Sequence, residues 1–194
     1  MAFLLFFNGL VHPCFFSSSF SFLILFFFFF FCCCCLVSRE WPGRIVYYTF
    51  HTSVTTTVGN VIRSAMDHWE DNTCLRFLLR TTQSDYIQFR TDDSGCYSDS
   101  IGRNGGRQVI NLGSGCRTMG ITAHEIGHAV GFWHEQTRPD RDSFVSINFN
   151  NIQDDKKHNF EKRKGEEVDY QGTGYDYGFV IYIKKKRAGG GGRR

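Results

Sequence analysis

Residues 124–142 read HEIGHAVGFWHEQTRPDRD, and this stretch carries the strongest signal in the chain. His124 and His128 are four positions apart, so in a helix they lie one turn apart on the same face and can bind one metal ion. Glu125 follows the first histidine, and from there its carboxylate can reach a water bound to that ion. The spacing predicts a helix that carries two zinc ligands and a general base.

Gly131 accounts for the arrival of a third ligand. Glycine tolerates the left-handed conformation that ends a helix and reverses the chain, so His134, three residues later, can return to the metal. Three imidazoles with one open coordination position are typical of a catalytic zinc, whereas structural sites have four protein ligands. We therefore expect one Zn²⁺ per chain, held by His124, His128 and His134. Three unrelated histidines remain the alternative, but the added G-x-x-H makes chance an improbable explanation.

The full pattern H-E-x-x-H-x-x-G-x-x-H resembles the metzincin signature, and its continuation E-x-x-R-x-D-R-D resembles the one that astacins add. The resemblance covers about Trp41 to Gly178. It implies a zinc endopeptidase that hydrolyses internal bonds of protein or peptide substrates, with Glu125 as the catalytic base. In astacins the glutamate after the third histidine lies near the mature N-terminus, which implies a structural role for Glu135. The matching residues of the continuation are Glu135, Arg138, Asp140, Arg141 and Asp142.

The resemblance also implies an α+β, metzincin-like fold, whose N-terminal subdomain is a twisted, mostly parallel sheet with two long helices. The sequence patterns agree with it. Apolar residues at helical spacing predict one helix from about 58 to 74 and a second over 118–133. Residues rich in β-branched and aromatic types predict strands. We place them at 44–50, 75–79, 86–90 and 108–112, with a loop over 92–107 and a strand or extended loop over 144–149.

Three cysteines remain once the apolar N-terminal segment is set aside: Cys74, Cys96 and Cys116. The resemblance implies a disulfide between Cys96 and Cys116. It also leaves Cys74 without the partner that the family provides further along the chain. The strand over 108–112 resembles the edge strand along which astacins place an extended substrate.

The sequence departs from the family after Tyr175-Asp176-Tyr177-Gly178. Astacins continue into a methionine turn and a tyrosine that is linked to zinc, but here Ile181 and Ile183 occupy those two positions. The chain therefore looks truncated before the methionine turn, with the C-terminal subdomain largely missing. A catalytically impaired or inactive fragment that retains zinc binding is the alternative function.

Composition divides the chain into three parts. Residues 1–38 are rich in Phe and Cys and read as a signal or anchor segment, or as sequence from a faulty gene model. Residues 39–183 form the peptidase domain and 184–194 a basic, Gly-rich tail. The net charge of +3 is too small to indicate a nucleic-acid partner. We expect a secreted protein, membrane-associated only if residues 20–37 are retained, and the oligomeric state stays open.

Overall fold

The computed structural model describes residues 39–165, 168 and 173–179. The apolar segment 20–37, the tail 184–194, and Ile181 and Ile183 lie outside these residues. Within the described part of the chain, no helix has the length and apolar character needed to cross a membrane.

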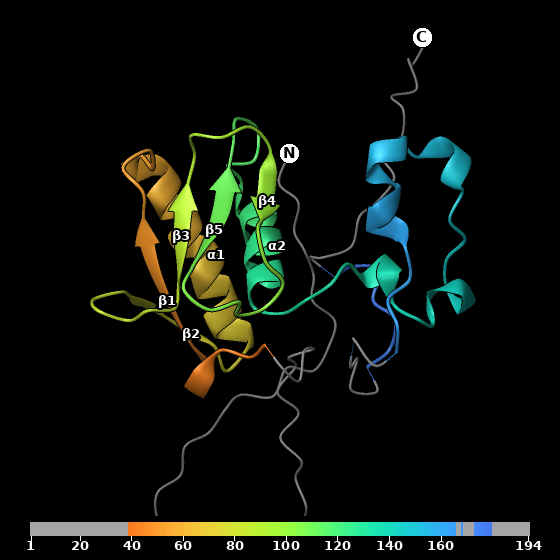
Figure 1. Cartoon of the computed structure of the whole chain (residues 1–194), viewed down its shortest axis with the longest axis horizontal. Coiled ribbons are helices and arrows are strands. Elements are labelled where there is room, and N and C mark those ends of the chain that lie inside the picture. The colour runs from red at the N-terminus through yellow and green to blue at the C-terminus, as the bar shows by residue number, and fades with distance from the viewer. Residues whose placement is uncertain (1–38, 166–167, 169–172, 180–194) are drawn as a thin grey trace, which may run out of the picture.

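A five-stranded sheet forms the first part of the molecule, with strand order β2-β1-β3-β5-β4 (Figure 1). The first four strands in this order run parallel, and only β4 pairs antiparallel, with β5. Two α-helices cover one face of the sheet, so the predicted α+β fold with a mostly parallel sheet is confirmed. The strands are β1 (Ile45–Phe50), β2 (Arg76–Leu79), β3 (Tyr86–Arg90), β4 (Cys96–Ser98) and β5 (Arg107–Leu112).

Two expectations about the edge of this sheet are wrong. The predicted loop over 92–107 contains β4, whose three residues, Cys-Tyr-Ser, are too few for a periodic signal. β5 lies between β3 and β4 and is an internal strand, so β4 and not residues 108–112 forms the edge. The buried pattern of β5 agrees, because Ile110, Asn111 and Leu112 have no exposed surface.

The two helices begin at the predicted places. In α1 (Thr56–Asn72) and α2 (Met119–Ala129), the hydroxyl of the preceding threonine, Thr55 or Thr118, accepts a hydrogen bond from the third following amide. The indole N–H of Trp69 on α1 donates to the Ala123 carbonyl of α2 over 3.0 Å and ties the helices together. Helix α2 ends four residues before the predicted position 133.

The described residues from 134 to 179 form a second part that lies to one side of α2 in Figure 1. Its described regular structure consists of 3-10 turns, and residues 144–149 form no strand. The turns are η2 (Glu135–Thr137), η3 (Arg141–Ser143), η4 (Phe149–Asn151) and η5 (Asp154–Phe160). Aromatic contacts join the two parts: the Phe132 and Phe179 rings lie 5.4 Å apart, and the Arg163 guanidinium lies 3.7 Å from the Trp133 ring centre.

Candidate metal centre

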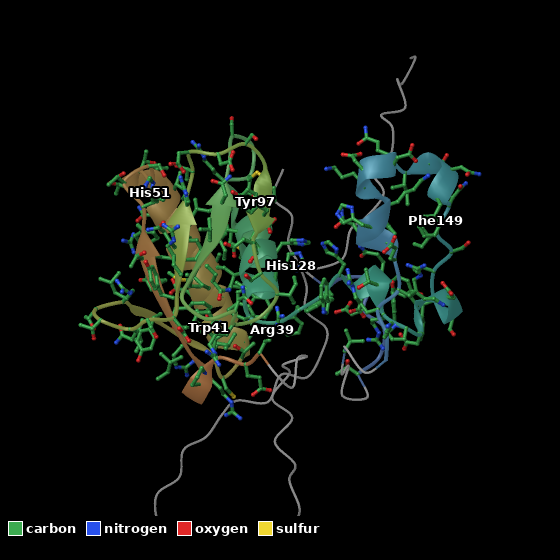
Figure 2. All side chains as sticks on the ribbon, in the orientation of Figure 1. Arg39, Trp41, His51, Tyr97, His128 and Phe149 are labelled. Atoms are coloured by element: carbon green, nitrogen blue, oxygen red, sulfur yellow. A yellow bond between two sulfur atoms is a disulfide. The ribbon has the colours of Figure 1, made fainter. Side chains whose placement is uncertain are left out.

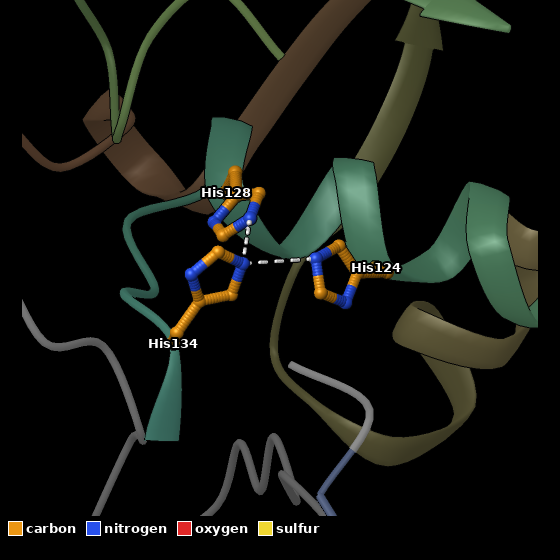
Figure 3. Close-up of side chains that lie close together, drawn as sticks. All are labelled: His124, His128 and His134. Carbon is orange, nitrogen blue, oxygen red and sulfur yellow. Dashed lines mark hydrogen bonds between the residues drawn. The ribbon is translucent and has the colours of Figure 1, made fainter. Parts of the chain in front are cut away.

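Three histidines converge between the two parts of the molecule (Figure 3). The Nε2 atom of His134 lies 3.2 Å from Nε2 of His128 and 3.3 Å from Nε2 of His124. One nitrogen of each ring therefore points to a common place. No other group of three or more histidine, cysteine or acidic side chains within the described residues is arranged to hold an ion.

These separations fit a zinc ion. Zinc binds histidine nitrogens at about 2.0–2.1 Å in tetrahedral sites, and the edge of such a tetrahedron is about 3.3 Å long. The measured Nε2 separations of 3.2 and 3.3 Å match that edge. Three nitrogen donors with a free fourth direction also suit a zinc that binds water or substrate.

The third histidine reaches this place because of how α2 ends. The Phe132 amide donates to the Gly127 carbonyl over 2.9 Å, and the Gly131 amide to the His128 carbonyl over 3.0 Å. This pair of bonds is a Schellman motif, which needs a positive φ at its penultimate residue. Gly131 has φ +119°, a conformation that side-chain-bearing residues rarely adopt. The predicted reversal at Gly131 is therefore present, and it begins earlier than the predicted helix end.

The surroundings keep the imidazoles in the form that binds metal. Nδ1 of His128 lies 2.8 Å from the Phe132 carbonyl, which leaves Nε2 of that ring as the metal-binding nitrogen. Burial, together with the neighbouring His124 ring, lowers the pKa of His128 to about 4. Burial likewise lowers the pKa of His134. Both rings are therefore neutral at physiological pH, and a neutral imidazole is what a metal requires.

Glu125 is buried beside the first histidine. Its carboxylate accepts a hydrogen bond from the Ser98 amide of β4, and burial raises its pKa to about 7. A carboxylate with a pKa near the working pH can both accept and return a proton. The roles of the Ser98 amide and the Phe132 carbonyl could not be predicted, because main-chain groups leave no signature in residue types.

Glu135 is buried and accepts hydrogen bonds from two groups of the second part. The Arg138 guanidinium donates to its Oε1 atom over 3.1 Å, and the Asp176 amide does so over 3.0 Å. Burial raises the pKa of Glu135, and these two donors act against that shift. The carboxylate therefore links the residue after the third histidine to the segment 173–179.

The cysteines differ in part from expectation. Cys96 and Cys116 form a disulfide with their Cα atoms 5.7 Å apart, and this bond joins β4 to the segment before α2. Cys74 is disulfide-bonded as well, although no cysteine follows Cys116 in this sequence.

A mostly parallel sheet beside a helix that carries H-E-x-x-H, with a third histidine returned by a glycine, is typical of the metzincin class of zinc metallopeptidases. Within that class, residues 35–192 match the model of the peptidase family Astacin. The chain belongs to the astacin family, whose members are zinc metalloendopeptidases.

Individual relatives agree with this assignment. The chain is 42% identical over 147 residues to bone morphogenetic protein 1 of Xenopus laevis, covering 76% of this chain and 21% of that protein. It is 42% identical over 149 residues to zinc metalloproteinase nas-39 of Caenorhabditis elegans, covering 76% and 16%. The chain thus spans about a fifth or less of the length of these relatives.

A solved structure is similar over most of its own length. High choriolytic enzyme 1, a hatching enzyme zinc-protease from the medaka Oryzias latipes, superimposes with a TM-score of 0.67 at 35% identity. The match covers 74% of this chain and 71% of that chain.

Proposed function

We propose that this chain is a zinc-dependent endopeptidase that hydrolyses internal peptide bonds of proteins. The observation that carries the proposal is the convergence of three histidine nitrogens, with the two Nε2 separations from His134 at the length expected between zinc ligands. The buried Glu125 directly follows the first of these histidines in the chain. His124, His128 and His134 would hold one Zn²⁺. Bound there, the ion would lower the pKa of water to about 7 and polarise a peptide carbonyl.

Glu125 moves the proton in this scheme. It accepts the proton of the attacking water and hands it to the departing amine, which its pKa near 7 allows. The Ser98 amide donates a hydrogen bond to this carboxylate. Because β4 is an edge strand, its free main-chain groups can pair with an extended peptide. Such pairing reads main chain and tolerates many side chains, which suits a protease. We therefore assign the substrate strand to β4.

The proposal includes secretion. Disulfides such as Cys96–Cys116 form in an oxidising compartment, and secreted proteins fold in such a compartment. We propose residues 39–183 as the peptidase domain, preceded by a signal or anchor segment at 1–38 and followed by a tail at 184–194. Retention of residues 20–37 in the mature protein would instead anchor it to a membrane, and intact mass distinguishes the two.

A second candidate is an impaired member of the family that binds zinc without efficient turnover. The observation that favours it is Ile181 and Ile183 at the positions of the family's methionine and tyrosine. Loss of a single donor that stabilises the oxyanion commonly lowers the rate by about 10²–10³.

Hydrolysis of a quenched peptide, together with zinc content, tests both candidates. We expect about one zinc per chain, and a rate that Glu125→Ala lowers by about 10²–10⁴ without releasing the metal. His128→Ala should lose the metal. Zinc binding with equal rates in the wild type and Glu125→Ala supports the impaired candidate. Absence of zinc from the folded wild type contradicts both.

A further inference from the structure

The loop over 99–106, between β4 and β5, reaches the candidate centre through main-chain hydrogen bonds. The Gly102 amide donates to the carbonyl of His128 over 2.9 Å. Ser98, immediately before the loop, donates its amide to Glu125. The loop thus contacts one histidine ligand, and the strand residue just before it contacts the proposed base. Main-chain amides make both contacts, and no side chain of the loop is needed for either.

Gly102 approaches the start of the described chain very closely. It has φ +70°, and a Cβ atom there would lie 2.8 Å from both the Cβ atom and the carbonyl oxygen of Arg39. Since real Cβ atoms do not approach that closely, only glycine fits. The carbonyl of Gly102 accepts from the side-chain amide of the buried Gln108 over 3.2 Å. The loop is therefore held from two sides.

Arg103 fastens this arrangement with three separate donors. Its amide donates to the Arg39 carbonyl over 2.8 Å, and its Nε atom donates to the Glu40 carbonyl over 3.2 Å. Its Nη1 atom pairs with Oδ2 of Asp85 over 2.6 Å. Oδ1 of Asp85 accepts a hydrogen bond from the Gly106 amide over 2.8 Å, so this carboxylate binds both the arginine and the end of the loop.

The segment that Arg103 binds, residues 39–41, also contacts the C-terminal end of α2. The indole N–H of Trp41 donates to the Ala129 carbonyl over 2.9 Å. Figure 2 shows Arg39 and Trp41 beside one another near the His128 end of that helix. The last carbonyls of a helix have no partners within it. Here Trp41 supplies a donor to the Ala129 carbonyl, and Gly102 adds a second donor to the His128 carbonyl, which the Gly131 amide also reaches.

We propose that Arg103 is a positioning residue for the metal centre. Anchored by Asp85, it holds the Gly102 amide on the His128 carbonyl and the segment 39–41 on the last turn of α2. It thereby fixes the direction of the His128 ring. The inference rests on the proposed function, because it concerns the same centre, but it adds a residue that does not contact the ion.

A second aspartate–arginine pair provides a matched control. Asp85 precedes β3, and Asp92 follows it, where Arg90 donates to both of its carboxylate oxygens over 2.8 Å. The side chains of the two pairs are exposed to similar extents, 33% and 29% against 32% and 34%. Asp92 lies 3.5 Å from His51, which Figure 2 places at the opposite end of the sheet from Trp41.

The test compares the full chain with Arg103→Ala, Arg103→Lys, Asp85→Asn and the control Arg90→Ala. Zinc affinity is measured by competition with a chromophoric chelator, and hydrogen exchange is measured on residues 126–131 in the zinc-free protein. Removing the partner of a metal-binding histidine costs about 10–100-fold in affinity, so we expect about tenfold for Arg103→Ala and Asp85→Asn. Arg103→Lys keeps the charge opposite Asp85 and should recover part of the loss. Arg90→Ala should change neither measurement.

The outcomes separate this inference from the proposed function. If the wild type binds zinc and Arg103→Ala binds it as tightly, the positioning role is wrong and the proposed function stands. A general loss of stability would lower the affinity of Arg90→Ala as much as that of Arg103→Ala, and this result would also overturn the role. If the wild type binds no zinc, the proposed function fails, and exchange at 126–131 decides alone: faster exchange in Arg103→Ala than in Arg90→Ala supports the positioning role, and equal exchange overturns it.

Discussion

The two parts of the molecule, residues 39–133 and the described residues from 134 to 179, are each stabilised by a different kind of bond. In the first part, strand ladders and two helices satisfy the backbone, and a disulfide and two tryptophan N–H groups add cross-links. In the second part, 3-10 turns satisfy few backbone groups, and arginine side chains complete the network. The metal centre joins the two, because His124 and His128 belong to the first part and His134 opens the second.

Two arginines make several of the side-chain hydrogen bonds described in the second part. Arg138 donates to Glu135 and Asp140 and to the carbonyls of residues 173 and 174. Arg141 donates to the carbonyls of Gln136 and Phe160. In the second part, the charged residues that follow His134 support this histidine, whereas in the first part a helix packed on the sheet supports His124 and His128. This difference implies that single side chains matter more in the second part than in the first.

Arg138→Ala should produce the largest loss of stability. The Arg138 and Glu135 side chains are only 9% and 10% exposed, and removing one partner of a buried pair costs about 3–5 kcal/mol. Urea unfolding followed by tryptophan fluorescence measures the free energy of unfolding. Arg90→Ala, which breaks a surface pair in the first part, is the control and should have little effect. Equal losses in the two variants would contradict the difference between the two parts.

Much of the first part could be predicted because its residues repeat with the period of a helix or strand. The apolar positions of α1, from Val58 to Trp69, are the buried ones, and β3 has its predicted bounds. The zinc pattern predicted which three histidines converge and which glycine reverses the chain after the helix. Helical spacing and the need for a positive φ leave few alternatives.

Other features depend on partners that are distant in sequence. β4 has three residues and is set by its pairing with β5 and by the Cys96–Cys116 bond. Gly102 and Arg103 contact main-chain atoms of His128 and Arg39, which lie far from them along the chain, and no local pattern encodes such contacts. In the second part, Arg138 and Arg141 donate to main-chain carbonyls that cannot be deduced from residue types.

Replacing both Cys96 and Cys116 by serine should give the next largest effect, and it acts on the first part. A disulfide that spans 20 residues stabilises a fold by about 3 kcal/mol in the chain-entropy model. Double substitution is preferable to a reductant, because a reductant would also break the disulfide of Cys74. Urea unfolding without reductant measures the loss. An unchanged free energy of unfolding would show that the strand ladder alone holds β4.

Zinc removal should loosen the connection between the two parts. An ion that binds only the folded chain stabilises it by about 2.7 kcal/mol at a concentration about 100 times its Kd. We expect a chelator to lower the melting temperature and to speed hydrogen exchange in residues 134–143 more than in β3. His128→Ala serves as the control, since its melting temperature should not respond to zinc. A wild type that is equally indifferent to zinc would refute the cross-link.

Gly131→Ala should have the smallest effect on unfolding and a larger one on zinc. Alanine at φ +119° is strained, at a cost of about 1–3 kcal/mol. The chain can relieve that strain by relaxing the reversal, and this would carry His134 away from the other two rings. Gly120→Ala is the matched control, because Gly120 lies in the first turn of the same helix with open space around it. This variant should raise the free energy of unfolding by up to about 1 kcal/mol. Zinc affinity lost only in Gly131→Ala would locate the junction between the two parts at this one residue, whereas equal affinities would show that His134 is held by the second part alone.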